Sequence, residues 1–337
     1  MIEILVELSR ENPPLARAEL DGALLAEGGR SRATPLPTPS EALVAGDVPD
    51  LAAAVRLALR LALGRRVLLA ARSGSTSETV QWFEHQGKRP GTAAIRPFGS
   101  PNAPLAARGL DEFARAFRSG GGRVELDDPS RRYFVARVGT LWWVAEEVAV
   151  VNRRELSARR MPLLPFRRPV SLPPKLGRVA VNLGAVRPGA RVLDPFAGTG
   201  ALALESALLG AQVTAVDRDA TMVRGAIQNL AAFGRSFENA LVADAGDAAR
   251  RYTGPPFDGV VTDPPYGRSS GMAGEERAVL VQRVLEAWSP HLGPSARVSV
   301  VLPGGPDPLS PPWERVVSVP DRVHRSLTRE FRVYARR

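Results

Sequence analysis

The sequence predicts an α/β protein in two parts, an α+β half followed by a doubly wound and mostly parallel sheet. From about residue 176 onward, short apolar strands alternate with amphipathic helices, which is typical of a doubly wound sheet. The first 150 residues also mix strands and helices, but without that regular alternation. A length of 337 residues is enough for two domains.

The first half begins with the apolar alternation IEILVEL at residues 2–8, which predicts a strand. Residues 14–29 predict a helix that ends at glycine. Further strands are expected within 67–75 and 132–152, and further helices within 49–64 and 110–121. We therefore expect residues 1–152 to form an α+β domain.

A basic, proline-rich stretch follows the first half. Its prolines predict a linker over residues 153–175 without a regular helix. Its basic residues are Arg153, Arg154, Arg159, Arg160, Arg167, Arg168 and Lys175, and Arg178 follows shortly after. The linker is either a solvated connector or a strip that neutralises phosphates.

The second half, residues 176–337, has the regular pattern. Helices are expected at 176–186, 201–210, 220–234 and 275–288. Strands are expected at 191–196, 212–217, 239–244, 257–263 and 296–303, with a closing hairpin within 313–336. This order predicts one sheet with helices on both faces.

Composition points to an anionic partner. The formal net charge is +10 and the sequence pI is about 11.0, which favours nucleic acid, although an arginine-rich composition also arises from a GC-rich genome. The chain has no cysteine, so it has no disulfide and no thiolate metal site, and we expect no bound metal. No apolar run is long enough to span a membrane and no signal peptide is visible. We expect a cytoplasmic protein.

The stretch VLDPFAGTG places Asp194 at a strand end and Gly198 and Gly200 in the turn before a helix. Ligands bind at the carboxyl ends of strands in such sheets. Asp217 and Asp244 fall at the next two strand ends, and a carboxylate about 20 residues after the loop suits ribose hydroxyls. An aspartate before the loop disfavours a pyrophosphate and favours a cationic ligand. These features indicate S-adenosylmethionine, and DPFAGTG resembles the first motif of Rossmann-like methyltransferases.

The stretch TDPPY follows the next predicted strand, so Asp263 is expected at the same edge of the sheet. An exocyclic amine of a nucleobase attacks a methyl sulfonium only after it loses planarity. The Asp263 carboxylate and the Pro264 carbonyl could each accept one N–H, and Tyr266 could stack on the base. The motif does not separate adenine N6, cytosine N4 and guanine N2 as targets. A base within a duplex or folded RNA would have to be flipped out.

Four segments together give a more specific resemblance: PPKLGRVAVNLGAVRPGARVLDPFAGTG, VDRDATMVRGAIQNLAAFG, VTDPPYGRSS and HRSLTREFRV. They resemble the archaeal tRNA (guanine-10, N2) methyltransferases over about residues 174–329. The resemblance implies a ferredoxin-like and THUMP region that binds tRNA in residues 1–152, followed by a Rossmann-like methyltransferase domain. The implied product is N2-methylguanosine, N2,N2-dimethylguanosine or both at position 10 of tRNA.

The predicted site residues fall into three groups. The catalytic motif is Asp263, Pro264, Pro265 and Tyr266. The cofactor residues are Asp194, Phe196, Gly198, Thr199, Gly200, Asp217, Arg218, Asp244 and Ala245. The RNA contacts are the seven basic residues of the linker together with Arg325 and Arg329.

Two other functions stay open at this point. One is an adenine-N6 methyltransferase acting on RNA or DNA, and the other is a catalytically inactive RNA-binding protein. We expect a monomer, and the sequence leaves open whether a small activating subunit is required.

Overall fold

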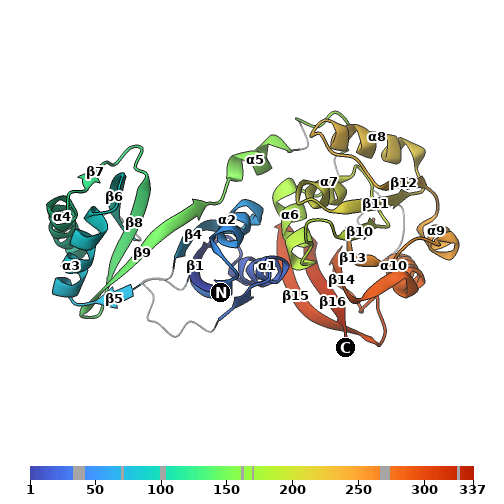
Figure 1. Ribbon diagram of the computed structural model, residues 1–337. Coiled ribbons are helices and arrows are strands. Elements are labelled where there is room, and N and C mark those ends of the chain that lie inside the picture. The colour runs from blue at the N-terminus through green and yellow to red at the C-terminus, as the bar shows by residue number, and fades with distance from the viewer. Residues whose placement is uncertain are drawn as a thin grey trace. The chain divides into compact units, whose positions relative to one another are not determined.

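The computed structural model describes residues 1–32, 42–69, 72–98, 104–160, 163–168, 171–265, 274–324 and 327–337, and these form two compact units (Figure 1). The first unit comprises Met1–Arg10, Glu27–Leu59 and Gly64–Val151. The second comprises Glu11–Ala26, Arg60–Leu63 and Asn152–Arg337.

The first unit is built on one sheet. Its strands are β1 (Ile2–Leu8), β2 (Arg30–Ser31), β3 (Leu43–Val48), β4 (Gly64–Leu69), β5 (Arg72–Gly74), β6 (Thr92–Pro97), β7 (Arg123–Val124), β8 (Arg131–Val138) and β9 (Leu141–Val150). Antiparallel pairing in the order β2-β3-β1-β4, with α1 (Pro13–Ala26) after β1 and α2 (Leu51–Arg60) after β3, is the connectivity of a ferredoxin-like fold. The sheet then continues through β9, β8, β6 and β7.

Two helices cover the far part of this sheet, α3 (Thr76–Gly87) and α4 (Pro104–Ser119) (Figure 1). Phe83 of α3 and Phe113 of α4 stack with ring centroids 5.2 Å apart, over a buried cluster that includes Tyr133 and Trp142. The sequence analysis did not predict α3. Its start is nevertheless encoded locally, because Ser75 and Glu78 form a capping box.

The second unit contains the doubly wound sheet that the sequence predicted. Its strands are β10 (Arg191–Asp194), β11 (Gln212–Asp217), β12 (Asn239–Val242), β13 (Phe257–Thr262), β14 (Leu292–Leu302), β15 (Trp313–His324) and β16 (Leu327–Arg336). The order is β12-β11-β10-β13-β14-β16-β15. The five strands from β10 to β14 are parallel, and the predicted β15–β16 hairpin closes the sheet with β16 inserted antiparallel beside β14.

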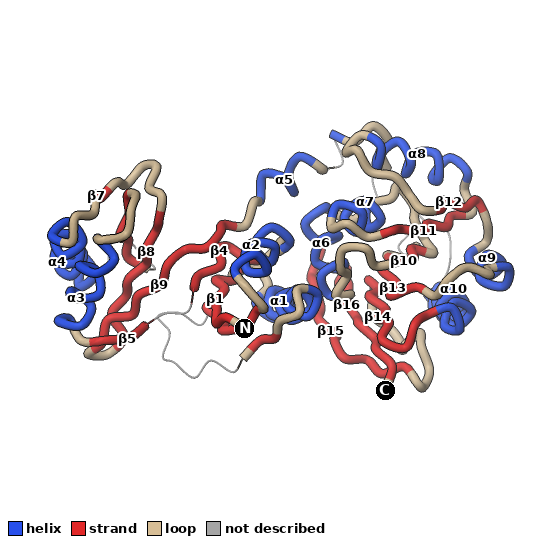
Figure 2. The backbone as a smooth tube through the Cα atoms, viewed as in Figure 1, coloured by secondary structure: helices blue, strands red, loops and turns tan. Residues whose placement is uncertain are grey.

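Helices flank both faces of this sheet (Figure 2). They are α6 (Pro174–Leu183), α7 (Ala201–Leu208), α8 (Ala220–Ala231), α9 (Ala245–Arg251) and α10 (Gly274–Trp288), while α5 (Arg153–Ala158) contacts α6. Successive strand residues serve opposite faces. Val260 packs into the cluster formed with α9 and α10, whereas Val261 faces Gly184 at the end of α6.

Helix α1 (Pro13–Ala26) belongs to the second unit, where it packs against α6 and β15. Glu19 of α1 is fully buried and accepts hydrogen bonds from the amides of Ala62 and Leu63 and from Asn182 Nδ2 of α6. Arg60 completes the network by donating to Asn182 Oδ1 at 3.0 Å. The second unit therefore draws on chain segments that precede residue 152.

The linker differs from the prediction of a segment without regular helix, because residues 153–158 form α5 and α6 begins at Pro174. Asn152 caps α5 by accepting the amide of Arg154, and Pro174 occupies the first turn of α6, where a missing amide costs nothing. All described residues of the linker count with the second unit. The assignment of residues 1–152 as a THUMP-containing tRNA-binding region stays a prediction.

The contact between α1 and α6 generates a test of stability. A Cβ at Gly22 would lie 2.2 Å from the Asn182 carbonyl oxygen, so Gly22→Ala must push α1 away from α6. We expect a loss of roughly 2 kcal/mol or more in the free energy of unfolding. Gly177→Ala in α6 is the control, because a Cβ there meets only ordinary contacts from 3.4 Å outward. Chemical denaturation that shows equal stability for both variants would contradict this packing.

Candidate active site

The candidate site lies where the strand order of the second unit reverses. Strand β10 sits between β11 and β13, and ligands of open α/β sheets bind beyond the carboxyl ends of strands at such a point. Asp194 ends β10, Asp217 ends β11, and Asp263 directly follows β13. The strand ends that the sequence predicted for these three acids are confirmed.

A buried hydrogen bond joins the ends of β10 and β13. Thr262 Oγ1 donates to Asp194 Oδ1 at 2.7 Å, and both side chains are almost fully buried. The amide of Phe196 donates to the same carboxylate oxygen at 3.2 Å. Because Thr262 immediately precedes Asp263, this bond sets the predicted catalytic motif beside the glycine loop.

Burial raises the pKa of Asp194 to about 7, and the nearby charge of Asp217 acts in the same direction. The hydrogen bonds from Thr262 and from the Phe196 amide oppose this effect. A carboxyl group with such a pKa changes its charge near neutral pH. A cation bound beside it would favour the ionised form.

The glycine loop has one open side and one closed side. Gly198 has φ 51°, and a Cβ on it would meet nothing within 4 Å. Gly200 has φ 80° and precedes α7, and a Cβ on it would lie 2.9 Å from the Ala226 Cβ. Gly200 is therefore required by backbone conformation and packing, whereas Gly198 leaves room for a ligand to approach the backbone.

Asp217 orders the neighbouring backbone. Its Oδ2 accepts the amide of Gly198 and its Oδ1 accepts the amide of Asp219, both at 2.9 Å. Asp244 caps α9 by accepting the amides of Gly246 and Asp247, and it also pairs with Arg283 at 3.2 Å. Arg218 is exposed beside Asp217.

The other residues predicted for the cofactor site and the catalytic motif differ in how deeply they are buried. Thr199 and Ala245 are buried, and the carbonyl of Ala245 accepts the indole N–H of Trp288. Phe196 is half-buried against the cluster under α9 and α10. Pro264 is buried and Pro265 is exposed, while Tyr266 lies outside the described residues.

Two predicted RNA contacts need correction. Arg159 is 6% exposed and donates to both carboxylate oxygens of Glu205, which Arg178 also contacts at 2.8 Å. Arg329 is 8% exposed, with its Nε 3.8 Å from Asp321. Arg159 is committed to the buried Glu205 carboxylate and Arg329 is itself buried, so neither side chain is placed to reach a phosphate and we leave both out of the proposed RNA-binding set.

The remaining basic residues of that set differ in their surroundings. Arg153, Arg154, Arg160, Arg167 and Arg168 are exposed, and Lys175 pairs with Glu11 at the start of α6. The Arg168 guanidinium lies 4.9 Å from the centre of the Phe166 ring. Arg325 lies outside the described residues.

Sequence reasoning missed three polar residues that organise the loop, namely Thr262, Asn229 and Ser171. Ser171 Oγ lies 2.8 Å from Thr199 Oγ1, and Asn229 Nδ2 donates to the Thr199 carbonyl at 2.9 Å. Thr262 stands beside Asp263 and could have been found as a polar residue that ends an apolar strand. Nothing local marks Asn229 or Ser171, because both come from segments distant from the loop in sequence.

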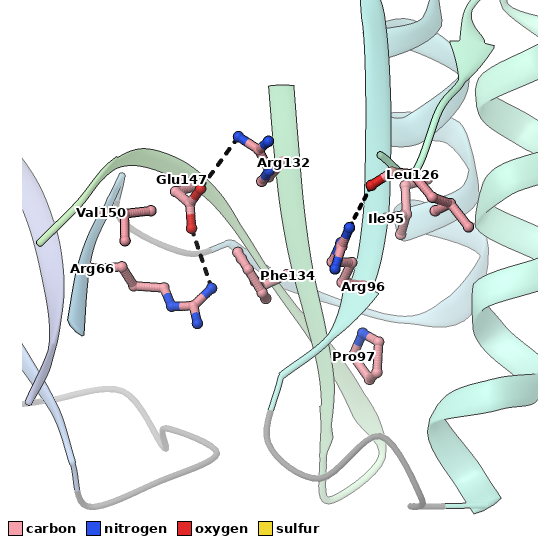
Figure 3. A pocket seen from close by; sticks show the side chains of 9 residues that line it. All are labelled: Arg66, Ile95, Arg96, Pro97, Leu126, Arg132, Phe134, Glu147 and Val150. Atoms are coloured by element: carbon pink, nitrogen blue, oxygen red, sulfur yellow. Dashed lines mark hydrogen bonds and ion pairs between the residues drawn. The ribbon is translucent and has the colours of Figure 1, made fainter. Parts of the chain in front are cut away.

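A separate concave surface lies in the first unit (Figure 3). It is lined by Arg66, Arg96, Arg132, Phe134, Glu147 and four apolar residues. Glu147 pairs with Arg66 at 3.2 Å and with Arg132 at 3.8 Å, and the Arg66 guanidinium lies 4.3 Å from the Phe134 ring centre. None of the predicted cofactor or catalytic residues lines this surface.

Comparison with known proteins matches the second unit to a methyltransferase family. The family described as "RMKL-like, methyltransferase domain" matches residues 163–310. The tRNA (guanine(10)-N2)-dimethyltransferase of Pyrococcus abyssi is 31% identical over 72% of this chain and 73% of its own length. This chain belongs to the tRNA (guanine(10)-N2)-dimethyltransferase family.

Other relatives extend the match. The family member from Methanothermobacter thermautotrophicus is 29% identical over 99% of this chain and 100% of its own length. The tRNA (guanine(6)-N2)-methyltransferase of Thermus thermophilus is 32% identical over 66% of this chain and 67% of its own length. Among solved structures, TrmN from Thermus thermophilus matches the fold with a TM-score of 0.50 at 22% identity, covering 99% of this chain and 100% of that one. The predicted methyltransferase fold and the family resemblance are confirmed.

The described residues offer little for other kinds of site. They include no group of three or more His, Asp or Glu side chains placed to hold a metal ion. None of their helices is long and apolar enough to cross a bilayer.

The raised pKa of Asp194 predicts how stability varies with pH. The folded state holds the Asp194 proton more tightly than the unfolded chain, so its stabilising effect is complete below pH 4 and is lost as pH rises to about 7. The loss over that window is at most roughly 4 kcal/mol. Asp194→Asn removes the titration, so the melting temperature of the unliganded wild type relative to this variant should fall between pH 4 and pH 7. A difference that does not change with pH would contradict the assignment.

Proposed function

We propose that this protein transfers methyl groups from S-adenosylmethionine to N2 of the guanosine at position 10 of tRNA. The observation that carries the proposal is the pairing of two strand ends. The Thr262–Asp194 hydrogen bond sets Asp263 and Pro264 beside the glycine loop within a chain of this family. The product would be N2-methylguanosine, N2,N2-dimethylguanosine or both.

The residues at the switch point fit this cofactor. Asp217 would bind the ribose hydroxyls, the open side of Gly198 would admit close approach to the backbone, and Asp194 would supply negative charge for a cationic ligand. Asp244, half-exposed between β12 and α9, would contact the base of the cofactor. When bound, S-adenosylmethionine supplies an activated methyl group.

Asp263 and Pro264 would act on the target amine. The carboxylate of Asp263 and the carbonyl of Pro264 each accept one N–H of the exocyclic nitrogen, which favours a tetrahedral nitrogen with an available lone pair. Proline restricts the backbone and so fixes the direction of that carbonyl. Tyr266 is the proposed stacking partner of the base.

One relative suggests guanosine 6 of tRNA as a second candidate for the methylated position. The relative that is named for guanine 6 covers two thirds of this chain at an identity similar to that of the guanine 10 relatives. We favour position 10 because a relative named for it matches along nearly the whole chain. Adenine N6 stays a chemical alternative, since the same two acceptors serve it.

The first test is product analysis on tRNA. The purified protein is incubated with labelled S-adenosylmethionine and a tRNA transcript, and the digested nucleosides are identified. We expect label in N2-methylated guanosine, and loss of label when guanosine 10 is replaced. Asp263→Asn should lower the rate by about 100-fold or more, because it removes a charged acceptor from the reacting amine.

Asp258→Asn is the matched control. It lies on the same strand, β13, but at the opposite end, where it accepts the amide of Arg191. Its activity should stay within a few fold of wild type. Label lost only when guanosine 6 is replaced would move the target to that position, and label in N6-methyladenosine would overturn the substrate while keeping the fold and the acceptors.

Arg168 is the best placed of the proposed RNA contacts in the second unit. The amide and the carbonyl of Phe166 are both hydrogen-bonded to Asn229, so the ring beneath the guanidinium is fixed. Holding the guanidinium over an aromatic face reduces the entropy lost on binding a phosphate. In the first unit, Arg66 and Arg132 of the concave surface pair with Glu147, but Arg96 is exposed and supports the proposal that residues 1–152 also contact tRNA.

Arg168→Ala should therefore weaken tRNA binding severalfold and reduce the slope of log Kd against log salt by about 1. Binding is measured by fluorescence anisotropy at several salt concentrations. Arg187→Ala is the control, since Arg187 is an exposed arginine just before the amino end of β10. Equal slopes for wild type and Arg168→Ala would remove Arg168 from the interface.

A further inference from the structure

A short piece of the linker packs on α7 and α8 and is connected to the glycine loop through the side chain of Asn229. Residues 163–168 are called the strap here. Leu164 is 8% exposed within a core cluster that includes Leu204 and Leu230. The Phe166 ring packs so tightly over α8 that a Cβ at Gly225 would lie 2.0 Å from it.

Asn229 connects the strap to the loop. It is 1% exposed, and all of its amide hydrogens are used. Nδ2 donates to the Phe166 carbonyl at 3.0 Å and to the Thr199 carbonyl at 2.9 Å, while Oδ1 accepts the Phe166 amide at 2.9 Å. The same Thr199 is bound a second time, through its hydroxyl, by Ser171 at 2.8 Å.

The loop is therefore held from two sides. Asp217 holds it at the Gly198 amide, and Asn229 and Ser171 hold it at Thr199. Asp217 is also the proposed partner of the cofactor ribose, so its carboxylate serves ligand and loop together. The bonds to Thr199 hold the carbonyl and the hydroxyl of a residue that is itself among the predicted cofactor contacts.

We propose that Asn229 is a positioning residue for cofactor binding, and that it holds the glycine loop in its binding geometry by tying the Thr199 carbonyl to the strap. The proposal rests on the proposed function in one respect, namely that the loop binds S-adenosylmethionine. It assigns to linker residues a role in the cofactor site, in addition to the RNA contact proposed for Arg168.

The test compares two buried asparagines of the same unit. Asn229→Ala removes the link to the loop. Asn182→Ala is the control, because Asn182 is equally buried and also makes three hydrogen bonds, which go to Glu19 and Arg60. Titration calorimetry with S-adenosylhomocysteine measures cofactor affinity, and thermal unfolding is recorded for each variant.

We expect Asn229→Ala to weaken S-adenosylhomocysteine binding about 10-fold and Asn182→Ala to leave it within twofold, although both lower the melting temperature. tRNA binding by Asn229→Ala should weaken by no more than the severalfold loss expected for Arg168→Ala, because the same asparagine fixes the Phe166 ring beneath that arginine. Equal cofactor affinity in Asn229→Ala and wild type would show a purely structural role and overturn the inference. A wild-type protein that binds no cofactor would overturn the proposed function as well, so the two failures are distinguishable.

A milder variant covers the case in which Asn229→Ala does not fold. Ser171→Ala removes the Ser171 hydroxyl, which hydrogen-bonds with the hydroxyl of Thr199, and should weaken S-adenosylhomocysteine binding about threefold. Ser157→Ala, at an exposed site on α5, should leave binding unchanged. Identical affinities for these two variants would contradict anchoring of the loop at Thr199.

Discussion

The hydrogen bond from Thr262 to Asp194 is the interaction on which the arrangement of the site depends. It joins two strands that are adjacent in the sheet but 68 residues apart in sequence. An unpaired carboxylate at this depth would be costly, so the threonine, the Phe196 amide and the raised pKa together make the buried acid tolerable. The cofactor loop and the Asp-Pro-Pro motif are adjacent because each directly follows one partner of this bond.

Buried charge also explains why the second unit includes chain segments that lie before its own sheet in sequence. Glu205 of α7 is matched by two arginines, Arg159 and Arg178, and all three are at least 90% buried. Glu19 and Arg60 are both bound by Asn182. Removing one partner from such a network leaves an uncompensated charge, which is far more costly than losing an exposed ion pair. The segment after α5, helix α1 and residues 60–63 are therefore structural parts of this unit.

The same bonds change how the basic linker is understood. Its positive charge suggests a uniform strip for phosphates, but part of that charge neutralises Glu205 and Glu11. What remains is a smaller exposed set, in which Arg168 rests on a ring fixed by Asn229. The proposed phosphate contact and the glycine loop are thus attached to the same asparagine.

The sequence by itself determined the parts whose signals are local. Strand and helix alternation gave the order of elements after residue 176, and Asp194, Asp217 and Asp263 were placed at strand ends because each terminates an apolar run. Local chemistry also encoded the capping box of α3, although it was not recognised. Only the tertiary structure decided which basic residues are buried, that α1 packs on α6, and that Asn229 and Ser171 reach Thr199. Those outcomes depend on side chains far apart in sequence, because burial and pairing are set by which surfaces the folded chain brings together.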